Sequence, residues 1–207
     1  MKFISDIITF FRDIFIEKSG EDDFLITVKN YTQIYKNQFE KNYLNEIIVA
    51  CAYKEIENDL KMYKYQSQQY KSKKIIRAYI EIFTKYSHTF GTKNIAIVPV
   101  PTHWRRKVFR GFDHMKYISK KLSKKINIPA LPLLSTKYTP QQSKLPRSKR
   151  LKNKIHAFRV KSSYKIPKKI ILIDDVISTG ATANECAKVL KQSGVQKVYG
   201  CFLATNQ

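Results

Sequence analysis

The apolar positions of this chain follow two different periods, and the change falls near residue 91. Before it, apolar residues recur at three- and four-residue steps in 3–15, 45–65 and 71–87, a spacing that predicts amphipathic helices. A short hairpin is also expected around residues 23–37. The first 90 residues are therefore predicted to form a mainly helical N-terminal segment that packs on the core.

From residue 95 onward, short apolar runs alternate with helical patterns. Strand followed by helix, repeated in this way, predicts an α/β fold with a mostly parallel sheet flanked by helices. We therefore expect a second region, residues 91–207, to form an α/β domain. Its expected strands are 95–100, 130–134, 168–175 and 197–206, and its expected helices are 112–126 and 182–194, the last closed by Gly194. The polar, basic stretch 135–156 is too long for an ordinary connection and predicts a functional or mobile loop.

Charge is distributed as unevenly as the apolar pattern. The formal net charge is +23, yet residues 1–90 hold 14 Lys or Arg against 12 Asp or Glu. Between His114 and Ile173 there are 17 Lys or Arg and no acidic residue. A field of this kind attracts polyanions such as nucleic acid, phosphorylated small molecules or acidic lipid.

Cysteine usage and hydropathy exclude several classes. Three scattered cysteines without CxxC spacing argue against a disulfide framework and against structural zinc. No stretch is long and apolar enough to predict a transmembrane span. The N-terminal pattern 3–15 is interrupted by charge, so it predicts neither a signal peptide nor a span. A helix packed on its own domain is favoured over a helix on a membrane surface.

The segment "IILIDDVISTGAT", residues 170–182, has the strongest chemical signal. Asp174 and Asp175 are expected to end a buried strand, where ligands of parallel sheets bind. The turn that follows can bind a phosphate through backbone N–H groups, hydroxyls and the positive end of the next helix. Carboxylates only accept hydrogen bonds, which suits the 2′ and 3′ hydroxyls of a ribose. The expected 5′-phosphate site comprises Ser178, Thr179, Gly180, Ala181 and Thr182.

Two common nucleotide-binding motifs do not fit this segment. A Walker A loop is excluded because no Gly-Lys-Ser/Thr closes the turn, and a dinucleotide fingerprint is excluded because its glycines are missing. A purely structural role stays open, in which the aspartates cap the strand and Ser178 or Thr179 caps the helix.

The motif resembles the phosphoribosyl-pyrophosphate (PRPP) signature of type I phosphoribosyltransferases. "VPVPTHWRRKVFRGFDH" and "TPQQSKLPRSKRLKNKIHAF" are similar to two further segments of ComF-type competence proteins. Together the three motifs cover about residues 60–205. Two features differ from the family pattern: the four-cysteine zinc module of many members is absent, and Asp113 and His114 stand where Asn and Gln are usual.

The resemblance implies roles for the residues at the matching positions. Asp174 and Asp175 would bind the ribose and, together with PRPP, Mg²⁺, while no structural zinc is expected. The expected pyrophosphate-binding residues are Thr102, Arg105, Arg106 and Arg110. The expected residues of a flexible loop that closes over the site or contacts DNA are Lys144, Arg147, Lys149, Arg150, Lys152, Asn153 and Lys154.

Three functional hypotheses follow. The leading one is a competence protein of natural transformation that binds PRPP and, on its basic surface, single-stranded DNA entering the cytosol. The second is an active phosphoribosyltransferase for a base or amine, although no acceptor pocket is visible in the sequence. The third is a non-catalytic adaptor that retains the motif as a remnant. By resemblance we expect a cytoplasmic protein, peripheral at the inner face of the membrane, with an inner-membrane DNA channel and other competence proteins as partners.

Overall fold

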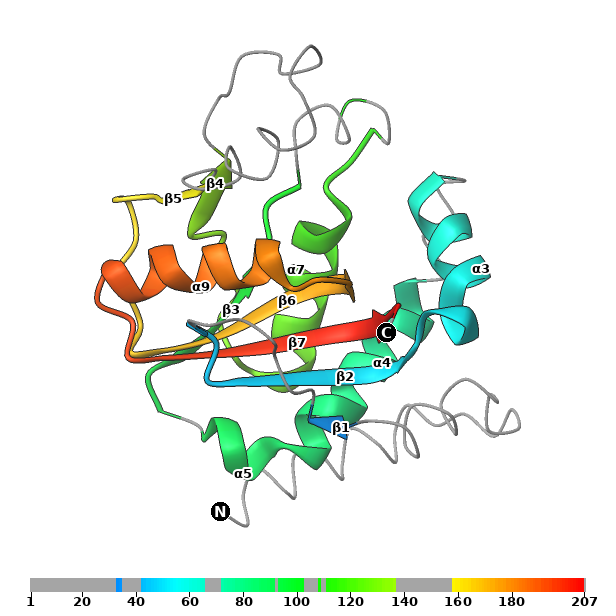
Figure 1. Ribbon diagram of the computed structural model, residues 1–207, viewed down its shortest axis with the longest axis horizontal. Helices are drawn as coiled ribbons and strands as arrows, with labels where there is room; N and C mark the ends of the chain where they lie inside the picture. Colours follow the sequence, from blue (N-terminus) through cyan, green and yellow to red (C-terminus); the bar gives the residue numbers. More distant parts are fainter. Residues whose placement is uncertain are drawn as a thin grey trace.

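The fold is built on a sheet of four parallel strands with one short antiparallel strand at its edge (Figure 1). The computed structural model describes residues 33–34, 42–65, 72–91, 93–102, 108, 111–136 and 158–206. The order across the sheet is β1-β2-β7-β6-β3. These strands span Gln33–Ile34 (β1), Glu46–Ala52 (β2), Ile95–Pro99 (β3), Lys169–Ile177 (β6) and Lys197–Thr205 (β7). The expected α/β class with a mostly parallel sheet is confirmed.

Helices cover both faces of the sheet, and each face has its own apolar cluster. Helices α4 and α7 pack on one face, against Ile171 and Ile173 of β6. Helix α9 packs on the other, against Ile170 and Leu172, next to the two-stranded ribbon β4–β5. The helices and ribbon strands span Tyr53–Tyr65 (α3), Ser72–Lys85 (α4), Ser87–Phe90 (α5), His114–Ile126 (α7), Ala181–Gln192 (α9), Leu134–Thr136 (β4) and Phe158–Val160 (β5).

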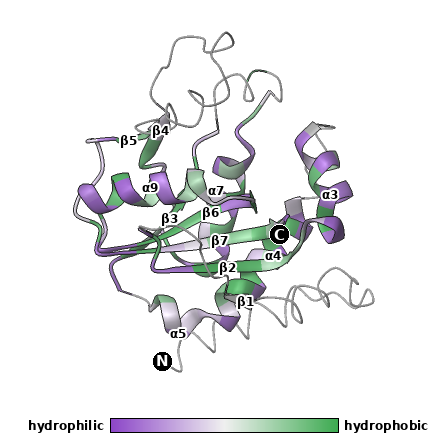
Figure 2. Cartoon of the chain, in the orientation of Figure 1, coloured by the Kyte–Doolittle hydropathy of each residue, from purple (hydrophilic) through white to green (hydrophobic). Residues whose placement is uncertain are grey.

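The central strands are apolar along almost their whole length, as Figure 2 shows for β2 and β7. Strands buried on both faces are continuous apolar runs because parallel sheets are covered by helices on each side. The strands predicted over 95–100, 168–175 and 197–206 and the helices over 71–87, 112–126 and 182–194 are confirmed to within two residues at each end.

The helix predicted over residues 45–65 is wrong in its first third. Residues Glu46–Ala52 form β2, which pairs in parallel with β7, and only Tyr53–Tyr65 are helical. The sheet therefore takes an inner strand from the segment before residue 91. In the run 130–134 only the end is a strand: Ala130 makes a single parallel bridge to Ile97, and β4 begins at Leu134.

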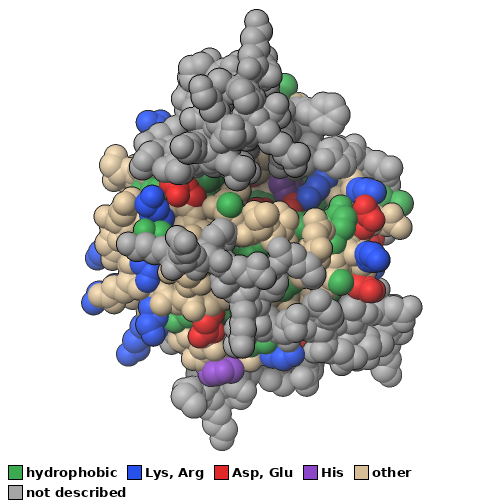
Figure 3. All heavy atoms as spheres, in the orientation of Figure 1, with side chains coloured by type: hydrophobic (Ala, Val, Ile, Leu, Met, Phe, Trp, Pro, Cys, Tyr) green, Lys and Arg blue, Asp and Glu red, His purple; other side chains and the backbone are tan. Residues whose placement is uncertain are grey.

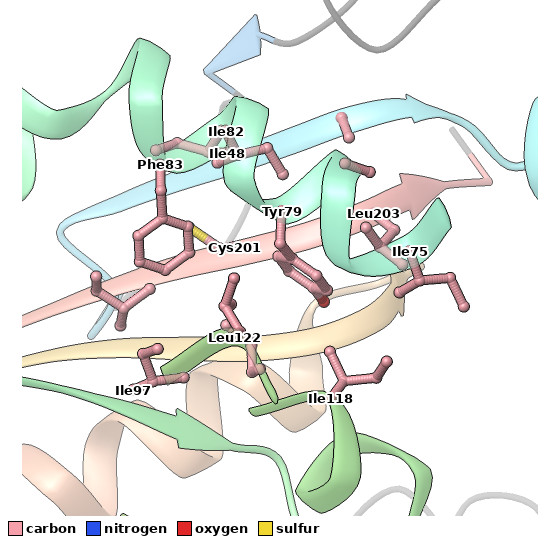
Figure 4. Packing of buried hydrophobic residues seen from close by; sticks show 14 of the residues in the cluster. Ile48, Ile75, Tyr79, Ile82, Phe83, Ile97, Ile118, Leu122, Cys201 and Leu203 are labelled. Carbon is pink, nitrogen blue, oxygen red and sulfur yellow. The ribbon is translucent and has the colours of Figure 1, made fainter. Parts of the chain in front are cut away.

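Tyr79 of α4 anchors the larger apolar cluster. Its side chain points from α4 towards the strands, between Leu203 and Leu122, and is fully buried (Figure 4). Burying an aromatic ring of this size removes much apolar surface from water and favours a fixed helix position. This packing holds α4 against the strand that contains the two aspartates.

Several predictions fall on residues that the structure does not describe. The helix over 3–15 lies outside the described residues, as do the 23–37 region except residues 33–34 and the loop 135–156 except residues 135–136. Among the residues that are described, no helix has the length and apolar character needed to cross a bilayer.

Candidate functional site

The two aspartates lie at the carboxyl edge of the sheet, beyond the end of the neighbouring strand. Strand β3 stops at Pro99, which pairs with Ile173, whereas β6 continues to Ile177 alongside β7. The expectation that the strand ends at the aspartates is therefore wrong by two residues. Their position at the open carboxyl edge is nevertheless the place where ligands of parallel sheets bind.

Neighbouring side chains of a strand point to opposite faces, and this alternation separates the aspartates. Asp175 continues the row of Ile171 and Ile173 and lies under the helices of the α4–α7 face. The charge of Asp174 also reaches the α9 face, where burial, and after it this charge, raises the pKa of the Cys186 thiol. The oxygens of the two carboxylates nevertheless remain within 4.8 Å of each other and of a ring nitrogen of His114.

Asp175 is buried and held by two cationic or donor groups. Its Oδ2 lies 2.6 Å from Nζ of Lys64 in α3 and 2.6 Å from Nε2 of His114 in α7. A carboxylate only accepts, so Nε2 is the protonated ring nitrogen of His114. Burial alone would raise the pKa of the Asp175 carboxyl, but the hydrogen bond from His114 and the charge of Lys64 outweigh it and hold this pKa well below its ordinary value.

Asp174 is only partly buried, and two hydrogen bonds fix its position. Its Oδ1 accepts from the N–H of Asp175 at 3.0 Å, and its backbone carbonyl accepts from the Tyr79 hydroxyl at 2.7 Å. Of the two acids, Asp174 is the more accessible to a ligand at the edge of the sheet. The structure thus gives the two neighbouring carboxylates different environments.

The turn after β6 exposes its hydroxyl side chains and enters α9 through a glycine. Ser178, Thr179 and Thr182 are exposed, and Gly180 has the left-handed conformation (φ 72°) immediately before α9. Gly180 is itself the N-cap, with no side-chain cap hydrogen bond. The nearest substitute is a long contact of 3.4 Å from the Ala181 N–H to Thr179 Oγ1. Neither Ser178 nor Thr179 is therefore the N-cap residue, although Thr179 accepts this long hydrogen bond from the first helical N–H, and both residues are exposed to solvent.

Thr102 lies near the same edge, but its hydroxyl has a local partner. Thr102 Oγ1 lies 3.3 Å from Oδ1 of Asp113, the N-cap of α7, which also accepts from the Lys116 N–H. The other expected pyrophosphate and loop residues lie outside the described residues: Arg105, Arg106, Arg110, Lys144, Arg147, Lys149, Arg150, Lys152, Asn153 and Lys154.

Three residues of the site are not predicted by the sequence patterns. Lys64 lies in the last turn of α3, where the local sequence gives no sign of a distant partner, and Tyr79 follows the ordinary apolar spacing of its helix. His114 stands out only as a departure from the family pattern. Each of the three meets the aspartates through a contact between residues at least 61 positions apart in the chain.

Comparison with known proteins points in the same direction as this geometry. No family model matches the chain. "Competence protein F" of Haemophilus influenzae is 36% identical over 107 residues, 50% of this chain and 47% of the relative. "Competence protein ComFC" of Streptococcus pneumoniae is 35% identical over 106 residues, 51% of this chain and 46% of the relative. The chain thus spans about half the length of the curated relatives it matches.

A shorter match concerns the enzymes suggested by the motif. "Adenine phosphoribosyltransferase" of Rhizobium meliloti is 54% identical over 35 residues, which are 17% of this chain and 19% of the enzyme. These similarities and the parallel α/β sheet confirm the predicted resemblance to ComFC-type proteins with a phosphoribosyltransferase-like domain.

Proposed function

We propose that this chain, which is similar over about half its length to ComF-type competence proteins, acts in natural transformation by binding PRPP and single-stranded DNA. The main support is the edge formed by β6 and α9, where Asp174, three exposed hydroxyls and a helix N-terminus lie together. In this proposal it works on the cytoplasmic side of the membrane, together with a DNA channel and other competence proteins.

The charges at this edge suit a sugar phosphate better than a bare phosphate. Backbone N–H groups and the dipole of α9 attract the 5′-phosphate, and Ser178, Thr179 and Thr182 can donate to it. Asp174 would repel a phosphate placed directly against it but can accept from sugar hydroxyls. A ribose 5-phosphate unit satisfies both, with the sugar towards Asp174 and the phosphate in the turn.

The donor groups fit a magnesium ion that arrives with the ligand. Mg²⁺ prefers oxygen ligands and is usually bound through one or two carboxylates plus substrate phosphates. Asp174 offers such a carboxylate, whereas Oδ2 of Asp175 is already shared by Lys64 and His114. Asp174, with Asp175 behind it, would hold the ion, which would neutralise pyrophosphate charge.

Helix α7 carries a row of exposed lysines that suits the DNA backbone. Lys116, Lys120 and Lys124 are exposed at one-turn intervals of about 6 Å, so a phosphate chain can contact them in succession. Beside this row lies a hollow of about 230 Å³, lined by Tyr117, Lys120, Lys121 and Lys124. Lys121 Nζ lies 5.5 Å from the centroid of the partly exposed Tyr117 ring, where a base can also stack.

Nucleic acid fits this helix better than a lipid surface does. The large exposed apolar side chains among the described residues are Met62 and Val108, and neither belongs to α7. A membrane helix inserts apolar side chains, whereas a polyelectrolyte needs only the cations. A second basic area lies where α9 ends and β7 begins (Figure 3), with exposed Lys165, Lys168 and Lys197.

The DNA part is tested by titrating a labelled oligonucleotide at several salt concentrations. Replacing Lys116, Lys120 and Lys124 by Gln should weaken binding and reduce the slope of log affinity against log salt by about 2, at about 0.7 per lost phosphate contact. The triple replacement of Lys165, Lys168 and Lys197 removes equal charge and should change the slope by less than half as much. No binding by the wild type would reject the DNA function, and equal effects of the two triples would reject α7 as its site.

An active transferase is the second candidate, favoured by the short match to adenine phosphoribosyltransferase. It predicts pyrophosphate release from PRPP and Mg²⁺ in the presence of a base or amine, and loss of this release in Asp174→Asn. If no acceptor supports turnover while PRPP still binds, the chain is a PRPP-binding protein without transferase activity.

A further inference from the structure

The motif carboxylate Asp175 is a buried anion whose surroundings come from outside the motif. Its side chain is 12% exposed, and that of Lys64 is 14% exposed. Burying a charge in this way is unfavourable unless hydrogen bonds and an opposite charge compensate it. Lys64 supplies the opposite charge and His114 a second donor, both directed at the same oxygen.

Two contacts at one oxygen fix how the carboxylate is turned. Because Oδ2 points to α3 and α7, the other carboxylate oxygen has a defined direction as well. The Asp175 N–H donates to Asp174 Oδ1, so the orientation of one residue is linked to that of the other. The accessible acid is therefore held in place by the buried one.

Lys64 also changes the electrostatics of the neighbouring phosphate site. Two carboxylates with oxygens within 4.8 Å of each other would together oppose an anionic ligand. The ammonium of Lys64 neutralises one of these charges and leaves a single carboxylate to accept from the sugar. A sugar phosphate can then bind beside the aspartates with less repulsion.

Helix α3 is held in the position that this contact needs. The Tyr63 hydroxyl donates to the His114 carbonyl at 3.3 Å, and the Tyr63 ring meets Phe112 edge-on at 5.7 Å between centroids. Tyr63 is buried, so the end of α3 is anchored on the start of α7. Lys64, the next residue, reaches β6 from this anchored position.

We propose that Lys64 is a positioning residue for sugar-phosphate binding, which acts with His114 by neutralising and orienting Asp175. The proposal rests on the proposed function, since it concerns the same PRPP site. It makes α3, which precedes the α/β repeat in sequence, a required part of that site. Asp174 is then the acid that faces the ligand, and Asp175 its internal support.

The test is calorimetric titration of PRPP with Mg²⁺ into the full chain, four variants at Lys64 and Asp175, and one control variant. Lys64→Met should weaken binding of PRPP with Mg²⁺ about tenfold, the lower end of the effect of removing a residue that orients a metal-binding carboxylate. Lys64→Arg, which restores the cation, should recover most of the affinity. The double variant Lys64→Met/Asp175→Asn leaves no uncompensated buried charge and should bind as weakly as Asp175→Asn alone.

Lys74→Met provides the matched control. Lys74 Nζ forms a partly buried ion pair with Asp59 Oδ2 at 2.9 Å, and this pair joins helix α4 to helix α3 rather than a helix to the motif strand. This variant should lower the melting temperature without changing PRPP affinity more than about twofold. If Lys64→Met also lowers only the melting temperature, or if Lys64→Arg binds as weakly as Lys64→Met, the positioning role is wrong. If the wild type does not bind PRPP, the proposed function itself fails.

Discussion

Substitution of Gly180 tests the role of the turn between β6 and α9, because the backbone conformation at this position disfavours any residue with a Cβ. Its φ of 72° lies in the left-handed region, where a residue with a Cβ is disfavoured by about 1–2 kcal/mol. We therefore expect Gly180→Ala to lower the free energy of unfolding by this amount. For a chain of this size that corresponds to a decrease in melting temperature of about 2–8 °C.

The same substitution should affect the ligand more than stability alone explains. Relief of the strained φ would rotate the peptide groups that open α9, which include the N–H groups expected to bind the phosphate. We expect the dissociation constant for PRPP with Mg²⁺ to rise about tenfold, equivalent to about 1.4 kcal/mol. Calorimetric titration of the folded variant below its melting temperature measures this directly.

Gly194 provides a control, because it also has a positive φ but lies at the other end of α9 from the turn. It has φ 98° just after α9, and an added Cβ would meet no atom within 4 Å. Gly194→Ala should therefore destabilise by a similar amount and leave PRPP affinity unchanged. The expected role of the turn is refuted if Gly180→Ala is destabilised yet binds PRPP within twofold of the wild type, or if the two variants weaken binding equally.

Three further predictions concern stability and reactivity. Tyr79→Phe removes the 2.7 Å hydrogen bond to the Asp174 carbonyl without leaving a cavity, and denaturant titration should show that the free energy of unfolding falls by about 1 kcal/mol. In the control Tyr117→Phe, at a partly exposed ring, it should hardly change. The lowered pKa of Asp175 contributes stability that is present above the ordinary carboxyl pKa of about 3.9 and is lost as the pH falls below it. The free energy of unfolding should therefore decrease on acidification from pH 5 to pH 3, and should decrease less in Asp175→Asn. Equal acid sensitivity of the two proteins would contradict the lowered pKa of Asp175. Burial raises the pKa of all three cysteine thiols, that of Cys51 to about 12, so a thiol reagent at pH 8 should label them only after unfolding. Rapid labelling of the native protein would show that the core is not closed.

The α/β repeat is predictable from the sequence because its strands and helices differ in length and flanking residues. Strand β2 is not predictable in this way, since the run Ile47–Cys51 is buried on both faces and therefore shows no alternation of apolar and polar residues. Such a run joined directly to a helix fits a helical spacing as well as a strand. Only the pairing with β7, about 150 residues later, distinguishes the two.

Contacts between distant residues also limit what the sequence predicts about single residues of the candidate site. The turn 178–182 is predictable because its residues are adjacent and their chemistry is local. The different environments of Asp174 and Asp175 depend on which face of β6 each occupies and on which helix covers that face. Lys64 and His114 reach Asp175 only after α3 and α7 have packed, and nothing in their local sequence indicates that contact.

PRPP binding is tested most directly by a thermal unfolding curve with and without PRPP and Mg²⁺, for the wild type and for Asp174→Asn. At 100 times its dissociation constant the ligand should add about 2.7 kcal/mol to the free energy of unfolding, a rise of about 5–10 °C in the melting temperature. We predict this rise in the wild type and its loss in Asp174→Asn. An unchanged melting temperature of the wild type at millimolar PRPP, or an equal rise in the variant, would contradict binding at this site.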